Sequence, residues 1–449
     1  MSYRPFASTI INWLYRQCVN YPPLRRVAFF FARFIPRLLA VALAAEVRDR
    51  TRYYAELNPT DAHPRIYFDV THLVNSNLKT GIQRVVLSLY QAVKREFGAS
   101  YEVCQVYLCY LKEKEAWHFC HYDPVLKNVS SEVVVPGPDD IFLGVDLNAL
   151  IIKPVNSGLF KDWKRRGVRV GFFVHDILPI EHPEWWPVGA DKNHELWLRT
   201  VLNVSTHVIC VSETTLRSVQ KFCADRQISN NDIVLKSVRL GSDLETLPSF
   251  QEGLSLQPEH RHILNSIKTF TMVGTIEPRK AHEGVLDAFE LLWDQGTEAA
   301  LVFVGKHGWQ REQLIQRIEN HPLYGSRLLW LRNLSDEALG EVYSASNYVV
   351  QASFAEGFGL PIVEAMQAGK TVIARDIPIF REILGSAGIF FAPHASASEL
   401  AEVFQRAIEN LSVSGSTSEH AGVVQTWSTT AIQVAEIIGI TQLGAPNAN

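Results

Sequence analysis

The chain has 449 residues, of which 47% are hydrophobic and 20% charged, and its formal net charge is −4 at pH 7. This length predicts more than one core, because a single domain usually holds about 100–200 residues. The negative net charge argues against bulk binding of nucleic acid, which requires a basic surface. Six cysteines in so long a chain do not indicate a disulfide scaffold.

Residues 1–60 are expected to form a basic, amphipathic helical extension. Residues 1–52 hold nine arginines and two acids, a formal charge of +7. No apolar run approaches the roughly 20 residues that span a bilayer, and arginines and Pro36 interrupt the runs that a signal peptide would need. Two interpretations stay open: a helix that lies on an anionic membrane surface, or an extension that packs on its own domain with solvated arginines.

Residues 65–248 are predicted to form a first Rossmann-like domain. Apolar residues from Ile82 to Phe97 recur at helical spacing. Gly81 lies just before this helix, in a loop that could receive an anion, although one glycine is a weak signal. The pattern alternates strands and helices, which implies a parallel sheet covered on both faces. Strands are expected at 65–71, 101–110, 116–121, 140–145, 168–174, 207–212 and 233–239, and further helices at about 191–205 and 213–224.

The strand expected at 168–174 is followed directly by polar residues. Its apolar run ends in His175 and Asp176, at the carboxyl end of the strand, where open α/β sheets bind ligands. A purely structural histidine is the alternative. Residues 177–187 contain too many prolines for regular structure, and Trp185 and Trp186 within them could stack on a sugar ring or cover the sheet.

Three cysteines and two histidines lie close together in the first domain and raise the question of a metal site. Cys104 and Cys109 have opposite parity in the predicted strand, so their side chains point to opposite faces. Packed thiols in a reducing compartment are the preferred interpretation of Cys104, Cys109 and Cys120, with His118 and His121 as neighbours.

Residues 268–425 are predicted to form a second Rossmann-like domain after a linker at 249–267. A last helix at 426–440 is a candidate to cross back to the first domain. Gly274 ends a buried strand, and Arg279 and Lys280 precede a helix, a combination suited to phosphate. Strands are expected at 269–275, 300–305, 327–331, 348–353, 371–374 and 388–391.

The segment after the strand at 348–353 contains the densest motif. Gly357 and Gly359 permit a tight turn, and Pro361 suits the first turn of a helix, whose free N–H groups attract anions. Glu356 and Glu364 flank this anion site and could accept hydrogen bonds from hydroxyls. The combination favours a nucleotide sugar as ligand; the alternative is a solvated turn with two surface acids.

Several stretches resemble known proteins. Four of them resemble the retaining family 4 glycosyltransferases, which have the GT-B fold of two doubly wound domains facing across a cleft: Gly274–Lys280, Val304–Trp309, Ser335–Leu339 and Glu356–Glu364. Two more, Thr80–Val85 and His175–Pro179, are similar to bacterial mannosyltransferases that build O-antigen and other surface polysaccharides. The resemblance covers roughly residues 65–440 in order, and it leaves the Arg-rich helical extension outside.

The resemblance implies catalytic roles for four residues. Arg279 and Lys280 match the pair that holds the donor diphosphate and stabilises the leaving group. Glu356 matches an acid near the donor sugar and the β-phosphate. His175 matches a histidine of the first domain that touches the donor sugar.

The resemblance also implies a donor-binding set. Glu364 matches the acid that accepts hydrogen bonds from the ribose hydroxyls, and Gly81 matches a loop beside the diphosphate. Backbone N–H groups of Phe358, Gly359 and Leu360 add contacts, and Gly274, Arg279 and Lys280 complete the set. No Asp-x-Asp motif stands at a strand end, so no metal or other cofactor is expected.

The function implied is a retaining transfer of a hexose, with mannose from GDP-mannose as first candidate. The acceptor would be a growing, lipid-linked surface polysaccharide. The protein would be located in the cytoplasm or at the cytoplasmic face of the inner membrane. Alternatives are a rhamnosyl- or glucosyltransferase that uses a dTDP- or UDP-sugar, a nucleotide-sugar epimerase, and a non-catalytic partner in polysaccharide assembly. A glycosidase with Glu356 and Glu364 as its carboxylates would leave Arg279 and Lys280 without a task.

Overall fold

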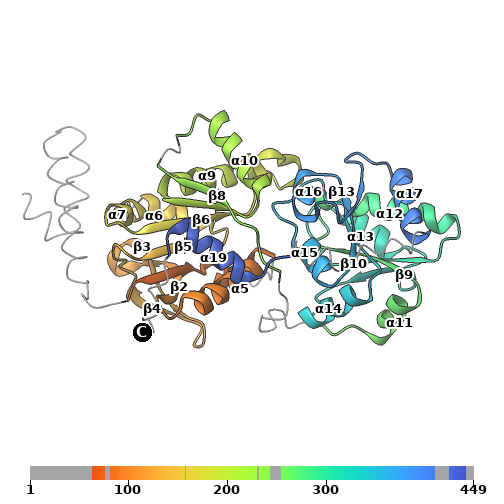
Figure 1. Cartoon of the computed structure of the whole chain (residues 1–449), viewed down its shortest axis with the longest axis horizontal. Coiled ribbons are helices and arrows are strands. Elements are labelled where there is room, and N and C mark those ends of the chain that lie inside the picture. Colours follow the sequence, from red (N-terminus) through yellow and green to blue (C-terminus); the bar gives the residue numbers. More distant parts are fainter. Residues whose placement is uncertain are drawn as a thin grey trace, which may run out of the picture. The chain divides into compact units, whose positions relative to one another are not determined.

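The computed structural model describes residues 63–75, 81–156, 158–229, 232–242, 254–409 and 424–440 (Figure 1). Residues 1–63 and 64–449 form two separate units. The predicted basic extension at 1–60 lies outside the described residues. Within the described part of the chain, no helix combines the length and the hydropathy needed to cross a membrane.

The first domain is built on an eight-stranded sheet. Its strand order is β4-β3-β2-β1-β5-β6-β7-β8. The strands are β1 (Arg65–Asp69), β2 (Glu102–Leu111), β3 (Ala116–Asp123), β4 (Asn128–Val133), β5 (Ile141–Gly144), β6 (Arg169–Val174), β7 (His207–Cys210) and β8 (Val234–Ser237).

The prediction of a wholly parallel sheet is wrong at one edge. β3 pairs antiparallel with β2 and with β4, and β4 was not predicted. The chain reverses between β2 and β3 in a short turn at Lys112–Lys114, with Glu115 in a left-handed conformation at φ 48°. A turn this short can join only antiparallel strands, because a parallel pair requires a crossover.

Helices cover both faces of this sheet. Residues 177–187 are more regular than predicted, because α8 and the short 3-10 turn at Pro183–Trp185 place their prolines in the first turn, where proline is tolerated. The helices are α4 (Thr71–Asn75), α5 (Gly81–Phe97), α6 (Ile152–Asn156), α7 (Leu159–Arg165), α8 (Leu178–Glu181), α9 (Ala190–Val204) and α10 (Glu213–Asp225).

The second domain is built on a six-stranded parallel sheet of order β11-β10-β9-β12-β13-β14. Its strands are β9 (Lys268–Val273), β10 (Ala299–Val304), β11 (Leu328–Leu331), β12 (Tyr348–Gln351), β13 (Thr371–Arg375) and β14 (Ile389–Phe391). Its helices are α11 (Pro258–Ser266), α12 (His282–Asp294), α13 (Glu312–Glu319), α14 (Asp336–Ala345), α15 (Leu360–Gln367), α16 (Pro378–Leu384) and α17 (Ala397–Glu409).

The prediction of a linker at 249–267 is wrong for the second part of this range. Residues 249–253 lie outside the described residues, but α11 occupies most of the remainder. Leu256 and Leu264 are buried in a cluster with Val302 of β10 and Leu329 of β11. This segment therefore belongs to the second domain.

The chain returns to the first domain at its C-terminal end. The helix expected at 426–440 is α19 (Trp427–Ile438), which packs against α5. Arg169 of β6 donates a hydrogen bond to the carbonyl of Ile438, at 3.1 Å.

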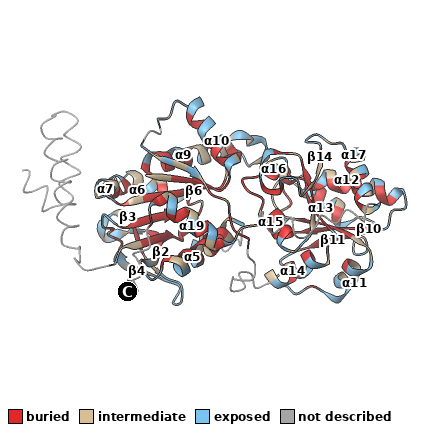
Figure 2. Ribbon diagram, viewed as in Figure 1, coloured by how far each residue is buried: buried red, intermediate tan, exposed pale blue. Residues whose placement is uncertain are grey.

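The central strands of both sheets are buried, as Figure 2 shows. One hydrophobic cluster contains residues of both domains, among them Leu89 and Val238 of the first and Ile362 and Ile383 of the second. The two domains therefore pack against each other, and the predicted α/β class with two doubly wound domains is confirmed.

The cysteines of the first domain pack as thiols. Cys109 on β2 and Cys120 on β3 have their Sγ atoms 3.2 Å apart, and every cysteine in the described part of the chain is free. No group of three or more His, Cys, Asp or Glu among those residues is arranged to hold a metal ion.

Candidate active site

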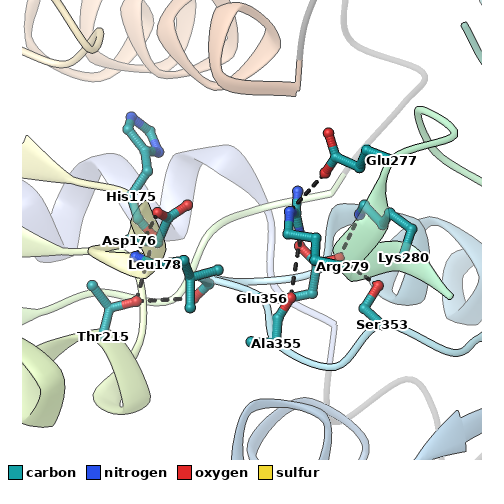
Figure 3. Close-up of polar contacts among 11 residues, drawn as sticks. His175, Asp176, Leu178, Thr215, Glu277, Arg279, Lys280, Ser353, Ala355 and Glu356 are labelled. Atoms are coloured by element: carbon teal, nitrogen blue, oxygen red, sulfur yellow. Dashed lines mark hydrogen bonds and ion pairs between the residues drawn. The ribbon is translucent and has the colours of Figure 1, made fainter. Parts of the chain in front are cut away.

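Glu356 is the centre of a buried charge cluster in the second domain (Figure 3). It lies in the loop between β12 and α15 and is 9% exposed. Its carboxylate accepts hydrogen bonds from Arg279 Nη1 at 2.5 Å, from Ser353 Oγ at 2.7 Å and from Lys280 Nζ. The structure thus brings together three residues that the sequence predicted for one site.

The charges of this cluster stabilise one another. Burial alone raises the pKa of Glu356, but Arg279 and Lys280 outweigh burial and hold the pKa at about 2. Burial likewise opposes the charge of Arg279, and Glu356 and Glu277 outweigh it and raise the pKa of the guanidinium. Glu356 is therefore an anion and Arg279 a cation at neutral pH.

Glu277 is a member of the cluster that sequence reasoning missed. Its Oε1 lies 2.6 Å from Arg279 Nε, and burial raises the pKa of its carboxyl. It belongs to the quoted motif Gly274–Lys280, but a lone acid beside a proline gave no signal of its own. Its partner Arg279 is thus held by two carboxylates.

Local backbone geometry places the cations. Arg279 and Lys280 lie in a 3-10 turn at Pro278–Lys280, between β9 and α12. Gly274, at the end of β9, has φ 151°, and a Cβ there would lie 3.4 Å from Lys280 Cε. Gly274 therefore lies in contact range of the Lys280 side chain, in a conformation that residues with a side chain rarely adopt.

Glu364 has separate partners from Glu356. It lies on α15, which begins after Gly359 in a left-handed conformation at φ 106°, and it is 4% exposed. Tyr343 of α14 donates its hydroxyl to Glu364 Oε2 at 2.7 Å, and Arg84 of α5 donates Nη1 to Oε1 at 2.5 Å. Arg84 comes from the first domain, and sequence reasoning assigned a role neither to it nor to Tyr343.

His175 lies at the end of β6 and is 9% exposed. Its Nε2 lies 2.7 Å from the carbonyl of Val145, and burial lowers the pKa of the imidazole, which is therefore neutral at pH 7. A Cβ on Gly357 would lie only 1.9 Å from the His175 carbonyl oxygen. Gly357 thus lets the loop that carries Glu356 pack directly on the strand end that carries His175.

The remaining predicted donor-binding residues also lie at the domain contact. Gly81 begins α5, and a Cβ there would lie 3.4 Å from Leu360 Cδ1 of α15. Phe358 is buried, and Gly359 precedes the first turn of α15. Residues 76–80, directly before Gly81, lie outside the described residues.

A hollow between the domains adjoins Glu356. Its wall includes Asp176 and Thr215 of the first domain and Phe354 and Glu356 of the second. The two domains therefore face each other across a cleft, as predicted, with Glu356 exposed to it on one side.

The paired tryptophans lie beside this cleft rather than on the sheet. The Trp185 ring stacks on Phe354, with centroids 6.0 Å apart, and the Trp186 ring lies 6.4 Å from that of Trp309. Trp309 Nε1 also donates a hydrogen bond to the Trp185 carbonyl at 2.7 Å. In this structure the tryptophans contact aromatic residues of the second domain.

The arrangement has a definite chemical capacity. Two cations hold one ionised carboxylate in the loop that leads into α15, at a domain contact. Cations and free N–H groups bind anions, and carboxylates accept hydrogen bonds from hydroxyls. The site therefore suits a ligand with both a phosphate and hydroxyl groups.

Residues 258–422 match the family model described as glycosyl transferases group 1. The serotype-specific mannosyltransferase WbdA of Escherichia coli is 33% identical over 343 residues, which are 74% of this chain and 41% of WbdA. The O-antigen chain mannosyltransferase RfbU of Salmonella typhimurium is 34% identical over 244 residues, 53% of this chain and 59% of RfbU. The chain thus spans about two to three fifths of the length of these relatives.

Solved structures share the fold at low sequence identity. HepE of Anabaena, in complex with UDP-glucose, has a TM-score of 0.56 at 15% identity, covering 84% of this chain and 100% of that one. The sucrose-phosphate synthase of Thermosynechococcus elongatus has a TM-score of 0.55 at 15% identity, covering 83% and 98%. The predicted GT-B fold is confirmed by these solved structures, and the predicted resemblance to glycosyltransferases is confirmed over residues 258–422, which match the group 1 model.

Proposed function

We propose that this chain is a retaining glycosyltransferase that moves a mannosyl residue from GDP-mannose to a surface polysaccharide of the O-antigen type. The observation that carries the proposal is the buried cluster in which Arg279 and Lys280 hold Glu356 beside the interdomain cleft. The choice of mannose rests on the relatives, which are named mannosyltransferases.

Breaking the bond between sugar and phosphate develops negative charge on the departing diphosphate. Arg279 and Lys280 would stabilise that charge as fixed cations in a site largely shielded from water. A preorganised donor at such a position lowers the barrier by about 3–4 kcal/mol. With these cations and the N-terminus of α15, the diphosphate would be held without a metal ion.

The remaining residues would position the donor. Glu364 would accept hydrogen bonds from the ribose hydroxyls, and the N–H groups of Phe358, Gly359 and Leu360 would contact the phosphates at the start of α15. Gly81 would bring the first domain close to the diphosphate. His175, neutral because it is buried, would contact the donor sugar.

Retention requires the acceptor hydroxyl to attack from the face that the diphosphate leaves. The departing phosphate oxygen would then take the proton of that hydroxyl, so that no protein base is required. Nuclear magnetic resonance of the product reports the configuration of the new bond. An inverted anomer would exclude this mechanism.

The acceptor would be lipid-linked, and residues 1–52 would bring the enzyme to an anionic membrane surface through their arginines and apolar clusters. Flotation with vesicles that contain an anionic lipid compares the full chain with residues 53–449. We expect only the full chain to float. Equal flotation of the two proteins would reject membrane contact through this segment.

A panel of nucleotide sugars tests the proposal. GDP-mannose, UDP-glucose and dTDP-rhamnose are each added to the full chain, first in a thermal-shift assay and then with a mannose-terminated oligosaccharide acceptor. A ligand that binds the folded state at 100 times its Kd stabilises it by about 2.7 kcal/mol. We expect GDP-mannose to raise the melting temperature most and to extend the acceptor. Transfer from UDP-glucose or dTDP-rhamnose alone would reject mannose, and isomerisation of the donor without acceptor would indicate an epimerase.

A further inference from the structure

We propose that Arg84, a residue of the first domain, positions Glu364 of the second domain for the donor ribose and so links domain contact to nucleotide binding. This inference rests on the proposed function and adds a residue to it. Arg84 would act through Glu364 and not touch the reacting atoms.

Arg84 reaches across the domain contact with both of its terminal nitrogens. It lies in the first turn of α5, and its two partners belong to the other domain, Asp336 on α14 and Glu364 on α15. Nη1 lies 2.5 Å from Glu364 Oε1, and Nη2 lies 2.6 Å from Asp336 Oδ1. One guanidinium therefore bridges two carboxylates that are far from it in the sequence.

The bridge is shielded from water. The side chains of Arg84 and Glu364 are 13% and 5% exposed, and that of Asp336 is 22% exposed. Burial opposes the charge of Arg84, but Glu364 and Asp336 outweigh it and raise the pKa of the guanidinium. Removing one partner of such a pair costs far more than at the surface, because the other charge stays buried.

The contacts fix the orientation of the Glu364 carboxylate. Arg84 binds Oε1 and the Tyr343 hydroxyl binds Oε2, so each oxygen has one donor, from opposite domains. A carboxylate has about four acceptor positions, which leaves two for a ligand. Two acceptor positions at a fixed angle match the vicinal hydroxyls of a ribose.

The planar fork of arginine explains why this residue type stands here. It presents donors in fixed directions, and a lysine offers one compact charge on a flexible stem. With lysine, a single ammonium would replace the two guanidinium nitrogens that contact Glu364 and Asp336. Arg84 belongs to the motif Thr80–Val85 and lies three residues after Gly81, on the same turn of α5.

Calorimetric titration with GDP and with 2′,3′-dideoxy-GDP tests this role in the full chain. The two probes differ only in the hydroxyls that Glu364 would bind, so the ratio of their Kd values reports that contact alone. We expect the wild type to bind GDP at least tenfold more tightly than the dideoxy probe. We expect R84M to reduce this preference to less than about threefold, and R84K to leave it at an intermediate value.

D336N is the matched control, because it removes the other partner of Arg84 and keeps the bond to Glu364. It should weaken both probes equally and retain the preference for GDP. If R84M behaves in the same way as D336N, Arg84 only fastens the domains and the inference is overturned. Circular dichroism spectra and melting temperatures of both variants report whether they fold.

A double-mutant cycle strengthens the test. If Arg84 acts through Glu364, R84M should cost little further GDP affinity when E364Q is already present, and additive losses would contradict the link. The same titrations separate the two levels of the argument. Wild type that does not bind GDP would overturn the proposed function and this inference with it, whereas tight GDP binding that R84M leaves unchanged would overturn only the role of Arg84.

Discussion

Gly357→Ala should separate the loop that carries Glu356 from the end of β6 that carries His175. A Cβ at this position would lie 1.9 Å from the His175 carbonyl oxygen and 3.0 Å from Asp176 Cβ. Ordinary contacts between carbon and oxygen begin at about 3.3 Å, so one of the two backbones must move by more than ~1 Å. Neither contact atom lies at the end of a flexible side chain, so the strain must be relieved by the backbone.

The expected cost follows from that displacement. Overpacking of this kind typically destabilises by about 1–3 kcal/mol. A displacement of about 1 Å near reacting groups can lower the rate about 100-fold. Because the displacement arises at this one contact between the domains, we expect turnover to fall about 100-fold while the circular dichroism spectrum stays that of the wild type.

Steady-state transfer from GDP-mannose to the oligosaccharide acceptor is the assay. Gly284→Ala is the control, because it adds the same methyl in the first turn of α12 with no atom within 4 Å. That variant should keep full turnover and gain about 0.5–1 kcal/mol of stability. Turnover of Gly357→Ala within threefold of the wild type would refute the reasoning.

Two further predictions concern stability. His282 is 1% exposed, and burial, with Lys280 beside it, lowers its pKa from 6.5 to about 3. Below pH 6.5 the unfolded chain takes up a proton that the folded chain does not, so the free energy of unfolding falls as the pH falls towards 3. In urea denaturation the wild type should lose about 2 kcal/mol of this free energy between pH 7.5 and pH 5 through His282, and His282→Leu should remove that loss. An unchanged pH dependence in the variant would contradict this. Glu382 of α16 accepts two hydrogen bonds from Thr214 at the start of α10: one from the backbone N–H at 2.9 Å and one from the side-chain hydroxyl at 2.7 Å. Glu382→Ala should lower the free energy of unfolding by about 1 kcal/mol in the same assay, because the side chain satisfies free donors in the first turn of α10. A change below about 0.3 kcal/mol would show that these hydrogen bonds do not stabilise the fold.

The periodicity of apolar residues was sufficient to predict most of the fold. Buried parallel strands are continuous apolar runs, as in Ala299–Val304, and amphipathic helices such as Gly81–Phe97 have a clear repeat. The antiparallel pairing of β3 was missed although the five residues between the strands expected at 101–110 and 116–121 are too few for a crossover. Helix α11 was missed because a helix that buries only Leu264 has no apolar repeat.

The site was predictable where residue type and local motif suffice. Arg279, Lys280 and Glu356 meet in the structure because a strand end, a turn and a helix start converge at one sheet edge. Arg84 could not be found in that way, because its bond to Glu364 joins positions 280 residues apart. Such a contact depends on how the two domains pack, which no local pattern encodes.

The proposed function gives Glu356 and Glu364 different tasks: Glu356 would lie at the bond that breaks, and Glu364 would hold the nucleotide. The most direct test measures turnover and GDP affinity for Glu356→Gln and Glu364→Gln side by side. We expect Glu356→Gln to lose about 100-fold or more in turnover while its Kd for GDP stays within threefold of the wild type. We expect Glu364→Gln to weaken GDP binding at least tenfold. Full turnover by Glu356→Gln, or an equal loss of GDP affinity in both variants, would contradict the division of roles.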